Sequence, residues 1–322
     1  MYCEFYGFRE KPFNITPNPR FIFLSKNHRE AFAHLLYGID NHAGFIELTG
    51  EVGTGKTTVL RTLFEQLDEK GHKTALIFNP CLSAHELMSC INREFGIPFE
   101  GLGVSDLLTA LNGFLLEENG ASRTVVLVID EAQNLEPKVL EQIRLISNLE
   151  TKTDKLIQLV LAGQPELGDL LGRPDLRQLA QRITVSYHLA PMDFDDTKAY
   201  IEHRLEVAGD YLAAVFSPQA LKDVFRYSGG VPRMINIVCD RALLFGYLAE
   251  SREISGAMTK SAIAEISRVN RNTSRNSIRR GAAFFLATVL LISVLAYVLM
   301  KLDLTRAAHP AQIGNTSDSK RN

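Results

Sequence analysis

A loop near the start of the chain has the residue types and spacing of a phosphate-binding site. Residues 50–57 fit the pattern G-x-x-x-x-G-K-[ST], between an apolar stretch at residues 44–48 and a helix-like run at residues 58–67. Glycines let backbone N–H groups converge on phosphate oxygens, the following helix adds the positive end of its dipole, and Lys56 adds a full charge. A glycine-rich turn that binds nothing is the alternative, but the flanking patterns argue against it. The predicted nucleotide-binding residues are Gly50, Glu51, Val52, Gly53, Thr54, Gly55, Lys56, Thr57 and Thr58.

Two adjacent carboxylates follow the most apolar strand-like segment of the chain. Residues 124–129 are largely β-branched, which is typical of a parallel strand covered on both faces, and Asp130 and Glu131 come directly after them. A carboxylate at Asp130 and a hydroxyl at Thr57 can hold Mg²⁺. Glu131 can orient and deprotonate a water that attacks the γ-phosphate. The pair predicts a site that hydrolyses ATP, with Mg²⁺ held at Thr57 and Asp130.

Phosphoryl transfer also needs positive charge near the transition state, which makes certain arginines candidates. Arg233 begins a helix-like segment and could reach back to the γ-phosphate. Arg173, Arg177 and Arg182 precede a strand-like segment, from which a side chain could enter a neighbouring subunit's site; Arg182 is favoured over Arg177. Gln164 follows another strand-like segment and could hydrogen-bond the attacking water. Ordinary surface or loop positions are the alternative for each of these residues.

Strand-like and helix-like segments alternate through the first part of the chain. This alternation predicts an α/β domain with a parallel sheet at residues 25–190. Only helix-like segments follow at residues 191–270, which predicts an all-helical lid. Residues 1–24 are rich in aromatics and prolines and are expected to be extended rather than helical, lying over the domain and covering the adenine ring. The predicted strands are residues 44–48, 73–78, 124–129, 156–162 and 182–187, and the predicted helices of the core include 25–37, 84–95, 104–116 and 137–149.

The last fifty or so residues suggest a membrane anchor. Residues 271–280 read as a basic linker, and residues 281–300 contain no charged side chain. At about 1.5 Å per residue, a helix of that length spans about 30 Å, the thickness of a bilayer's hydrocarbon core. Arginines before it predict that the large N-terminal part lies in the cytoplasm and that residues 301–322 form a short polar periplasmic tail. A buried helix is the alternative.

Composition narrows the classes of partner and cofactor. The formal net charge is −2, which argues against a surface built mainly to track nucleic acid. The four cysteines include no C-x-x-C pair and the eight histidines no i, i+4 pair, so neither a disulfide framework nor a zinc site is expected.

Several motifs in a fixed order carry a family resemblance. They are residues 50–57, 128–133, 161–167, 176–183 and 229–233, together with residues 5–8 and 12–19. They resemble the motifs of AAA+ ATPases and, more closely, of the ExeA (GspA) family, over about residues 1–270. The resemblance implies a three-layer P-loop core with a helical lid. It also implies that Asp130 and Glu131 are the Walker B acids, Gln164 sits at sensor 1, Arg182 is at or near the arginine finger, and Arg233 is sensor 2.

The resemblance also implies partners and a location. Members of the family are ATPases of the bacterial inner membrane that work with a membrane protein partner to assemble a type II secretion secretin, and relatives serve pilus or exopolysaccharide export. We therefore expect ATP and Mg²⁺ as ligands, a single-pass anchor, a homo-oligomer and a membrane partner of an export system. ExeA continues into a periplasmic peptidoglycan-binding domain, whereas residues 301–322 offer only a polar tail, so direct cell-wall binding is not expected. A DNA-transposition or DNA-loading ATPase and a nucleotide-gated scaffold with slow hydrolysis are the alternatives.

Overall fold

The computed structural model describes residues 2–16, 18–67, 71–78, 83–151, 154–209 and 214–268. Contacts group Met1–Ile263 into one unit, to which the elements described below belong, except for the end of the helix at residues 256–268. The predicted linker at 271–280, membrane helix at 281–300 and tail at 301–322 lie outside the described residues. Within the described ranges, no helix is both long enough and apolar enough to cross a membrane.

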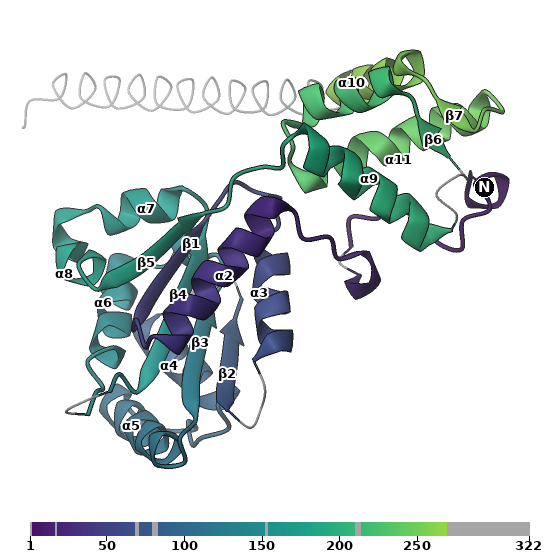
Figure 1. The fold of residues 1–322 in the computed structure, drawn as a ribbon. Coiled ribbons are helices and arrows are strands. Elements are labelled where there is room, and N and C mark those ends of the chain that lie inside the picture. Colours follow the sequence, from purple (N-terminus) through teal and green to yellow (C-terminus); the bar gives the residue numbers. More distant parts are fainter. Residues whose placement is uncertain are drawn as a thin grey trace, which may run out of the picture. The chain divides into compact units, whose positions relative to one another are not determined.

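A five-stranded parallel sheet forms the centre of the α/β part (Figure 1). In the order in which they pair, the strands are β2 (His72–Ile77), β3 (Thr124–Ile129), β4 (Ile157–Gly163), β1 (Phe45–Thr49) and β5 (Ile183–His188). The predicted strands are thus confirmed, each shifted by at most one residue. Because β4 lies between β3 and β1, the carboxyl ends of these three strands meet at one edge of the sheet.

Helices cover both faces of the sheet (Figure 1). One face carries α2 (Lys26–Asp40) and α3 (Lys56–Gln66), and the other carries α4 (Ala84–Glu94), α5 (Val104–Gly120) and α6 (Pro137–Ile146). Two short helices that the sequence reading missed, α7 (Glu166–Leu171) and α8 (Arg177–Ala180), lie between β4 and β5 in sequence.

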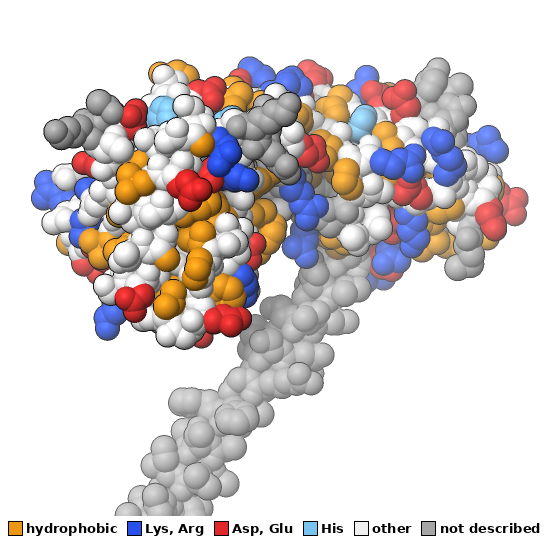
Figure 2. Space-filling view, turned by 90° about the horizontal axis from the view of Figure 1, so that it is seen from below, with side chains coloured by type: hydrophobic (Ala, Val, Ile, Leu, Met, Phe, Trp, Pro, Cys, Tyr) orange, Lys and Arg blue, Asp and Glu red, His pale blue; other side chains and the backbone are white. Residues whose placement is uncertain are grey.

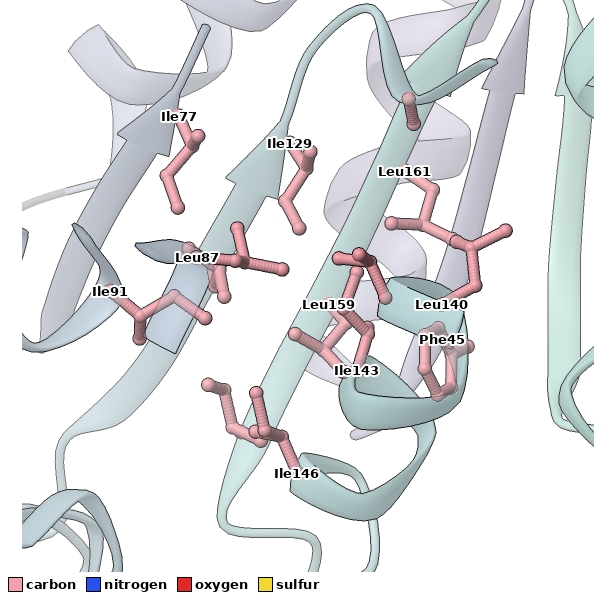
Figure 3. Close-up of a cluster of buried hydrophobic side chains, with 14 of the residues drawn as sticks. Phe45, Ile77, Leu87, Ile91, Ile129, Leu140, Ile143, Ile146, Leu159 and Leu161 are labelled. Atoms are coloured by element: carbon pink, nitrogen blue, oxygen red, sulfur yellow. The ribbon is translucent and has the colours of Figure 1, made fainter. Parts of the chain in front are cut away.

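Alternation along the strands explains why they are apolar throughout. In β3, Val126 and Val128 pack with α2 and α3, while Val125, Leu127 and Ile129 pack with the helices of the other face. Figure 3 shows part of the second of these clusters, with Leu159 of the sheet beside Ile143 of α6. Burying both faces holds the strand ends, and hence the residues that follow them, in fixed positions.

The helical part contains a small sheet as well. Its helices are α9 (Phe194–Ala208), α10 (Pro218–Ser228) and α11 (Pro232–Leu248), and residues 256–268 are also helical. The prediction of helices alone was wrong in one respect, because β6 (Val215–Phe216) pairs in parallel with β7 (Glu253–Ile254). Strands of two residues are too short to produce a recognisable alternation, and only their buried members, Phe216 and Ile254, mark them.

The start of the chain also differs from the prediction. Residues Tyr2–Tyr6 form a short helix, α1, so the expectation of an extended segment was wrong there. The prolines on which that expectation rested come later and do not constrain these residues. Helix α1 packs on α11, where the Tyr2 hydroxyl donates to Asp240 and the Tyr6 hydroxyl is 3.1 Å from the carbonyl oxygen of Leu243. The N-terminal segment (residues 1–24) is thus fastened to the lid at one end and continues into α2 of the core at the other.

Candidate nucleotide-binding site

The phosphate loop connects the carboxyl end of β1 to the first turn of α3. Gly55 has a φ of 106°, in the left-handed region that favours glycine, and Lys56 opens the helix. The Lys56 ammonium donates to the carbonyl oxygens of Gly50 at 2.6 Å and Glu51 at 3.2 Å. Burial lowers the pKa of Lys56, while the carboxylates of Glu131 and Asp130 oppose this shift. The Lys56 ammonium is therefore hydrogen-bonded to backbone carbonyls of its own loop and lies near the carboxylates of Glu131 and Asp130.

A histidine that the sequence reading missed supports this loop from α2. His28 is 2% exposed; its Nε2 lies 2.8 Å from the Thr54 carbonyl oxygen and its Nδ1 2.6 Å from the Ser25 hydroxyl. A carbonyl can only accept, so Nε2 carries the proton and Nδ1 accepts from Ser25. A Cβ at Gly55 would lie 2.4 Å from His28 Nε2, so glycine is required at that position. Nothing in the sequence spacing links residues 28 and 54, and only the fold brings them together.

The predicted metal ligands come together as expected from their places after β1 and β3. Thr57 donates its hydroxyl to Asp130 Oδ2 at 2.9 Å, and Asp130 Oδ1 accepts the backbone N–H of Glu131 at 2.9 Å. Asp130 is 2% exposed, and burial raises its pKa in spite of these two hydrogen bonds. Hydroxyl and carboxylate oxygens are the kind of ligand that Mg²⁺ prefers, and here the two lie close together. The residues therefore fit a magnesium ion.

Glu131 and Gln164, from two different strand ends, also lie together. The Gln164 side-chain amide is 3.4 Å from Glu131 Oε2, and Gln133 donates to the same oxygen at 2.6 Å. Gln133 belongs to the Asp130–Gln133 motif, but the sequence reading gave it no role. The structure thus adds a second amide to the group around the carboxylate.

A cavity of about 430 Å³ lies beside the loop and is lined by residues from all three parts of the chain. The core contributes residues of the loop and α3 together with Glu131, and the lid contributes Arg233. The backbone N–H of Arg233 lies 3.4 Å from the carbonyl oxygen of Gly53, so the first turn of α11 sits against the loop. Its exposed guanidinium forms no ion pair with any described residue. Arg233 is therefore brought to the site as predicted, with its charge available.

The N-terminal segment and helix α9 form the other wall of the cavity. Arg204 of α9 is 6% exposed; it lies over the rings of Phe21 and Tyr200, at 5.0 and 5.4 Å, and donates to the Tyr200 hydroxyl at 2.6 Å. A further donor of Arg204 lies 3.4 Å from the carbonyl oxygen of Asn14. The predicted covering segment thus lines the cavity, and it is held there by an arginine that the sequence reading did not single out.

The three candidate arginines before β5 do not line this cavity. Arg173 forms a two-point ion pair with Asp175, and Arg182 donates to the Ser147 hydroxyl at 2.8 Å. Arg177 is exposed, and among the described residues no side chain binds its guanidinium. Arg182 precedes β5, whose Ile183 pairs with Phe45, the first residue of β1, so it lies at the edge of the sheet opposite the phosphate loop. None of the three is therefore brought to the nucleotide cavity of its own chain.

The parallel sheet, the loop between β1 and α3, the two acids after β3 and the helical lid define a P-loop nucleotide-binding protein of the AAA+ class. An AAA domain family matches residues 39–171. The chain is 47% identical over 268 residues to general secretion pathway protein A of Aeromonas hydrophila. The matched region covers 83% of this chain and 49% of that protein. The chain belongs to the ExeA/GspA family of AAA+ ATPases. It spans about half the length of that relative.

Solved structures share the fold at low sequence identity. The Aeropyrum pernix ORC2 protein, in ADPNP-ADP complexes, aligns with a TM-score of 0.60 at 18% identity, over 80% of this chain and 72% of that one. Cdc6p from Pyrobaculum aerophilum aligns with a TM-score of 0.60 at 22% identity, over 76% of this chain and 67% of that one. These likenesses show the fold of the core and lid.

Proposed function

We propose that this protein binds ATP with Mg²⁺ and hydrolyses it to ADP and phosphate. The observation that carries the proposal is the meeting of Lys56, Thr57, Asp130 and Glu131 at one edge of the sheet, beside a cavity that the lid helps to line. Lys56 and the loop N–H groups would hold the phosphates, and the N-terminal segment would cover the adenine. Mg²⁺ held at Thr57 and Asp130 would neutralise charge on the phosphates.

Hydrolysis in this site is assigned to the residues after the strands. Glu131 takes a proton from the attacking water as the water oxygen bonds to the γ-phosphorus, and the bridging oxygen leaves with ADP. Gln164, 3.4 Å from the Glu131 carboxylate, would hydrogen-bond that water. Arg233 supplies positive charge from the lid, and Arg182 or Arg177 would supply it from a neighbouring subunit of a homo-oligomer.

We place this activity at the inner face of a bacterial inner membrane, where it drives assembly or operation of an envelope export complex. Residues 281–300 would be the single-pass anchor, and a membrane protein of the export system would be the partner. The name of the Aeromonas relative supports a role in secretion. On the face shown in Figure 2, acidic and basic side chains are interspersed, which does not favour a nucleic-acid surface.

The hydrolytic assignment is tested with the Glu131→Gln variant of the full-length chain. It should bind ATP with an affinity within about threefold of the wild type but lose at least about 100-fold in kcat, because only the base is removed. Glu117→Gln, at an exposed position of α5, is the matched control and should leave both quantities unchanged. Equal turnover by the Glu131→Gln variant would contradict the role of Glu131 as the base. Absence of turnover by the wild type would contradict the proposed ATPase activity.

The anchor is tested separately by fractionation. Membranes from cells that express the wild-type chain should retain it through an alkaline carbonate wash. A Leu290→Lys/Leu295→Lys variant should be released, because each charge at the centre of a bilayer is unfavourable by about 2.5–3.5 kcal/mol on insertion scales. Release of the wild-type chain by the same wash would contradict the anchor.

A further inference from the structure

Gln133 joins the proposed catalytic base to the end of the neighbouring strand. Its Nε2 donates to Glu131 Oε2 at 2.6 Å, and its Oε1 accepts the backbone N–H of Gln164 at 3.1 Å. These two partners fix the orientation of the amide, since a backbone N–H can only donate and a carboxylate can only accept. The carboxylate of Glu131 is therefore tied, through one side chain, to a backbone atom after β4.

The backbone around Glu131 is shaped for this contact. Glu131 has φ 56° and ψ 36°, a left-handed backbone conformation that residues other than glycine adopt rarely. The chain turns there into a short 3-10 helix, Ala132–Asn134, and this turn brings Gln133 back to the carboxylate two residues before it. An uncommon conformation at a site residue is consistent with a functional constraint on where its side chain lies.

Space for the amide is provided by a glycine on β4. A Cβ at Gly163 would lie 2.7 Å from Gln133 Oε1 and 3.1 Å from the side chain of Leu167. Because the Leu167 side chain is buried, it has no room to move away, so a larger residue at 163 would displace the amide. The strand end and the glutamine thus fit each other independently of the hydrogen bonds.

We propose that Gln133 is a positioning residue for ATP hydrolysis, which holds Glu131 by Oε2 and leaves Oε1 to accept the proton of the attacking water. The side-chain amide of Gln164 lies on the same side, 3.4 Å from Oε2, so the hydrogen-bond donors around the carboxylate gather on one oxygen. The inference rests on the proposed function, in which Glu131 is the base. Gln133 itself does not line the nucleotide cavity, so it acts through Glu131 rather than on the substrate.

The first test is the steady-state kinetics of the full-length Gln133→Ala variant. We expect kcat to fall about tenfold to 100-fold, because a misplaced base loses proximity to the water, while KM and the dissociation constant for ATP stay within about twofold. Gln66→Ala, at an exposed position of α3, is the matched control and should behave as the wild type. An unchanged kcat, or a loss of ATP affinity as large as the loss of kcat, would overturn the proposal.

A double-mutant cycle separates positioning from a merely structural role. In the Glu131→Gln background the Gln133→Ala change should lower residual hydrolysis no further, since the group it positions is already gone. An additional tenfold loss in that background would mean that Gln133 acts independently of the base, which overturns the inference.

The variant Gln133→Glu adds a pH readout and guards against a general folding defect. It keeps the size of the side chain but replaces the donor with a carboxylate next to Glu131. Its kcat relative to the wild type should be lowest at high pH and should recover as the pH falls and the new carboxyl group regains a proton to donate. A ratio that does not vary with pH would contradict the proposal. If the wild type hydrolyses ATP and Glu131→Gln abolishes it, but Gln133 variants are normal, this inference alone fails.

Discussion

His28 links the phosphate loop to α2 through a single protonation state. Its Nε2–H is used by the Thr54 carbonyl and its Nδ1 by the Ser25 hydroxyl, so the neutral ring satisfies both contacts. A second proton on Nδ1 would reverse the contact, with the ring donating to the Ser25 hydroxyl oxygen, and would place a positive charge on a buried ring. The loop that would hold the phosphates is thus supported by a group whose charge state changes in an accessible pH range.

This state predicts a pH-dependent stability for the nucleotide-free protein. Burial lowers the pKa of His28 below its usual 6.5, and repulsion by Arg29 acts in the same direction, while Asp196 and the Thr54 carbonyl oppose it. As the pH falls below 6.5, the unfolded chain takes up a proton that the folded chain refuses, so stability is lost by up to about 1.4 kcal/mol per pH unit. Urea denaturation of the full-length chain between pH 7.5 and pH 5.5 should show this loss.

The His28→Gln variant should lose part of that slope, because it keeps a side-chain donor but does not titrate. His34→Gln, at an exposed position on the same helix, is the matched control. If both variants changed the slope equally, His28 would not be the group responsible.

Contacts between residues close together in the chain can be predicted from sequence, whereas contacts between distant residues cannot. The phosphate loop and the two acids are short contiguous motifs whose chemistry follows from their residue types, so their geometry could be predicted. The support of Thr54 by His28 and the bridge from Gln133 to Gln164 join residues that are far apart in sequence and have no fixed spacing. The same holds for Arg204, which shares α9 with a second cation, Lys198, and stands out from it by no sequence pattern.

At the scale of elements, the N-terminal segment and α9 form one wall of the cavity through the Arg204 side chain. Its guanidinium stacks on Phe21, binds Tyr200 and reaches the Asn14 backbone. A planar fork with several donors makes these contacts at once, and a lysine ammonium cannot. The wall that would cover the base therefore depends on the shape of this cation as well as on its charge.

The Arg204→Lys variant should therefore bind ATP more weakly while retaining its turnover at saturation. We expect the dissociation constant to rise about tenfold, equivalent to about 1.4 kcal/mol, as the segment loses its attachment to α9. Calorimetric titration of ATP into the full-length chain measures this. Arg226→Lys, whose arginine is 74% exposed on α10, should bind as the wild type, and an unchanged affinity for Arg204→Lys would leave the segment without this role.

At the scale of the whole molecule, the site of one chain lacks a positive charge if hydrolysis requires Arg182 or Arg177, because neither residue lines the cavity of its own chain. The five residues of β1 separate the edge of the sheet that carries Arg182 from the phosphate loop, which at about 3.3 Å per residue is about 16 Å. In the proposed homo-oligomer, the arginine would instead act on a neighbouring copy, through a head-to-tail contact that repeats around the oligomer.

Mixing inactive subunits tests this arrangement. Lys56→Ala removes the phosphate cation and Arg182→Ala the arginine, so each full-length variant alone should lose most ATPase activity. In an equal mixture, half of the sites keep Lys56 and half of those face a neighbour with an intact arginine, so activity should return to about a quarter of the wild type. Repeating the mixture with Arg177→Ala identifies the acting residue, and Arg173→Ala, whose arginine is paired with Asp175, serves as the control. A mixture no more active than the sum of its parts, for both Arg182 and Arg177, would contradict a site shared between neighbouring chains.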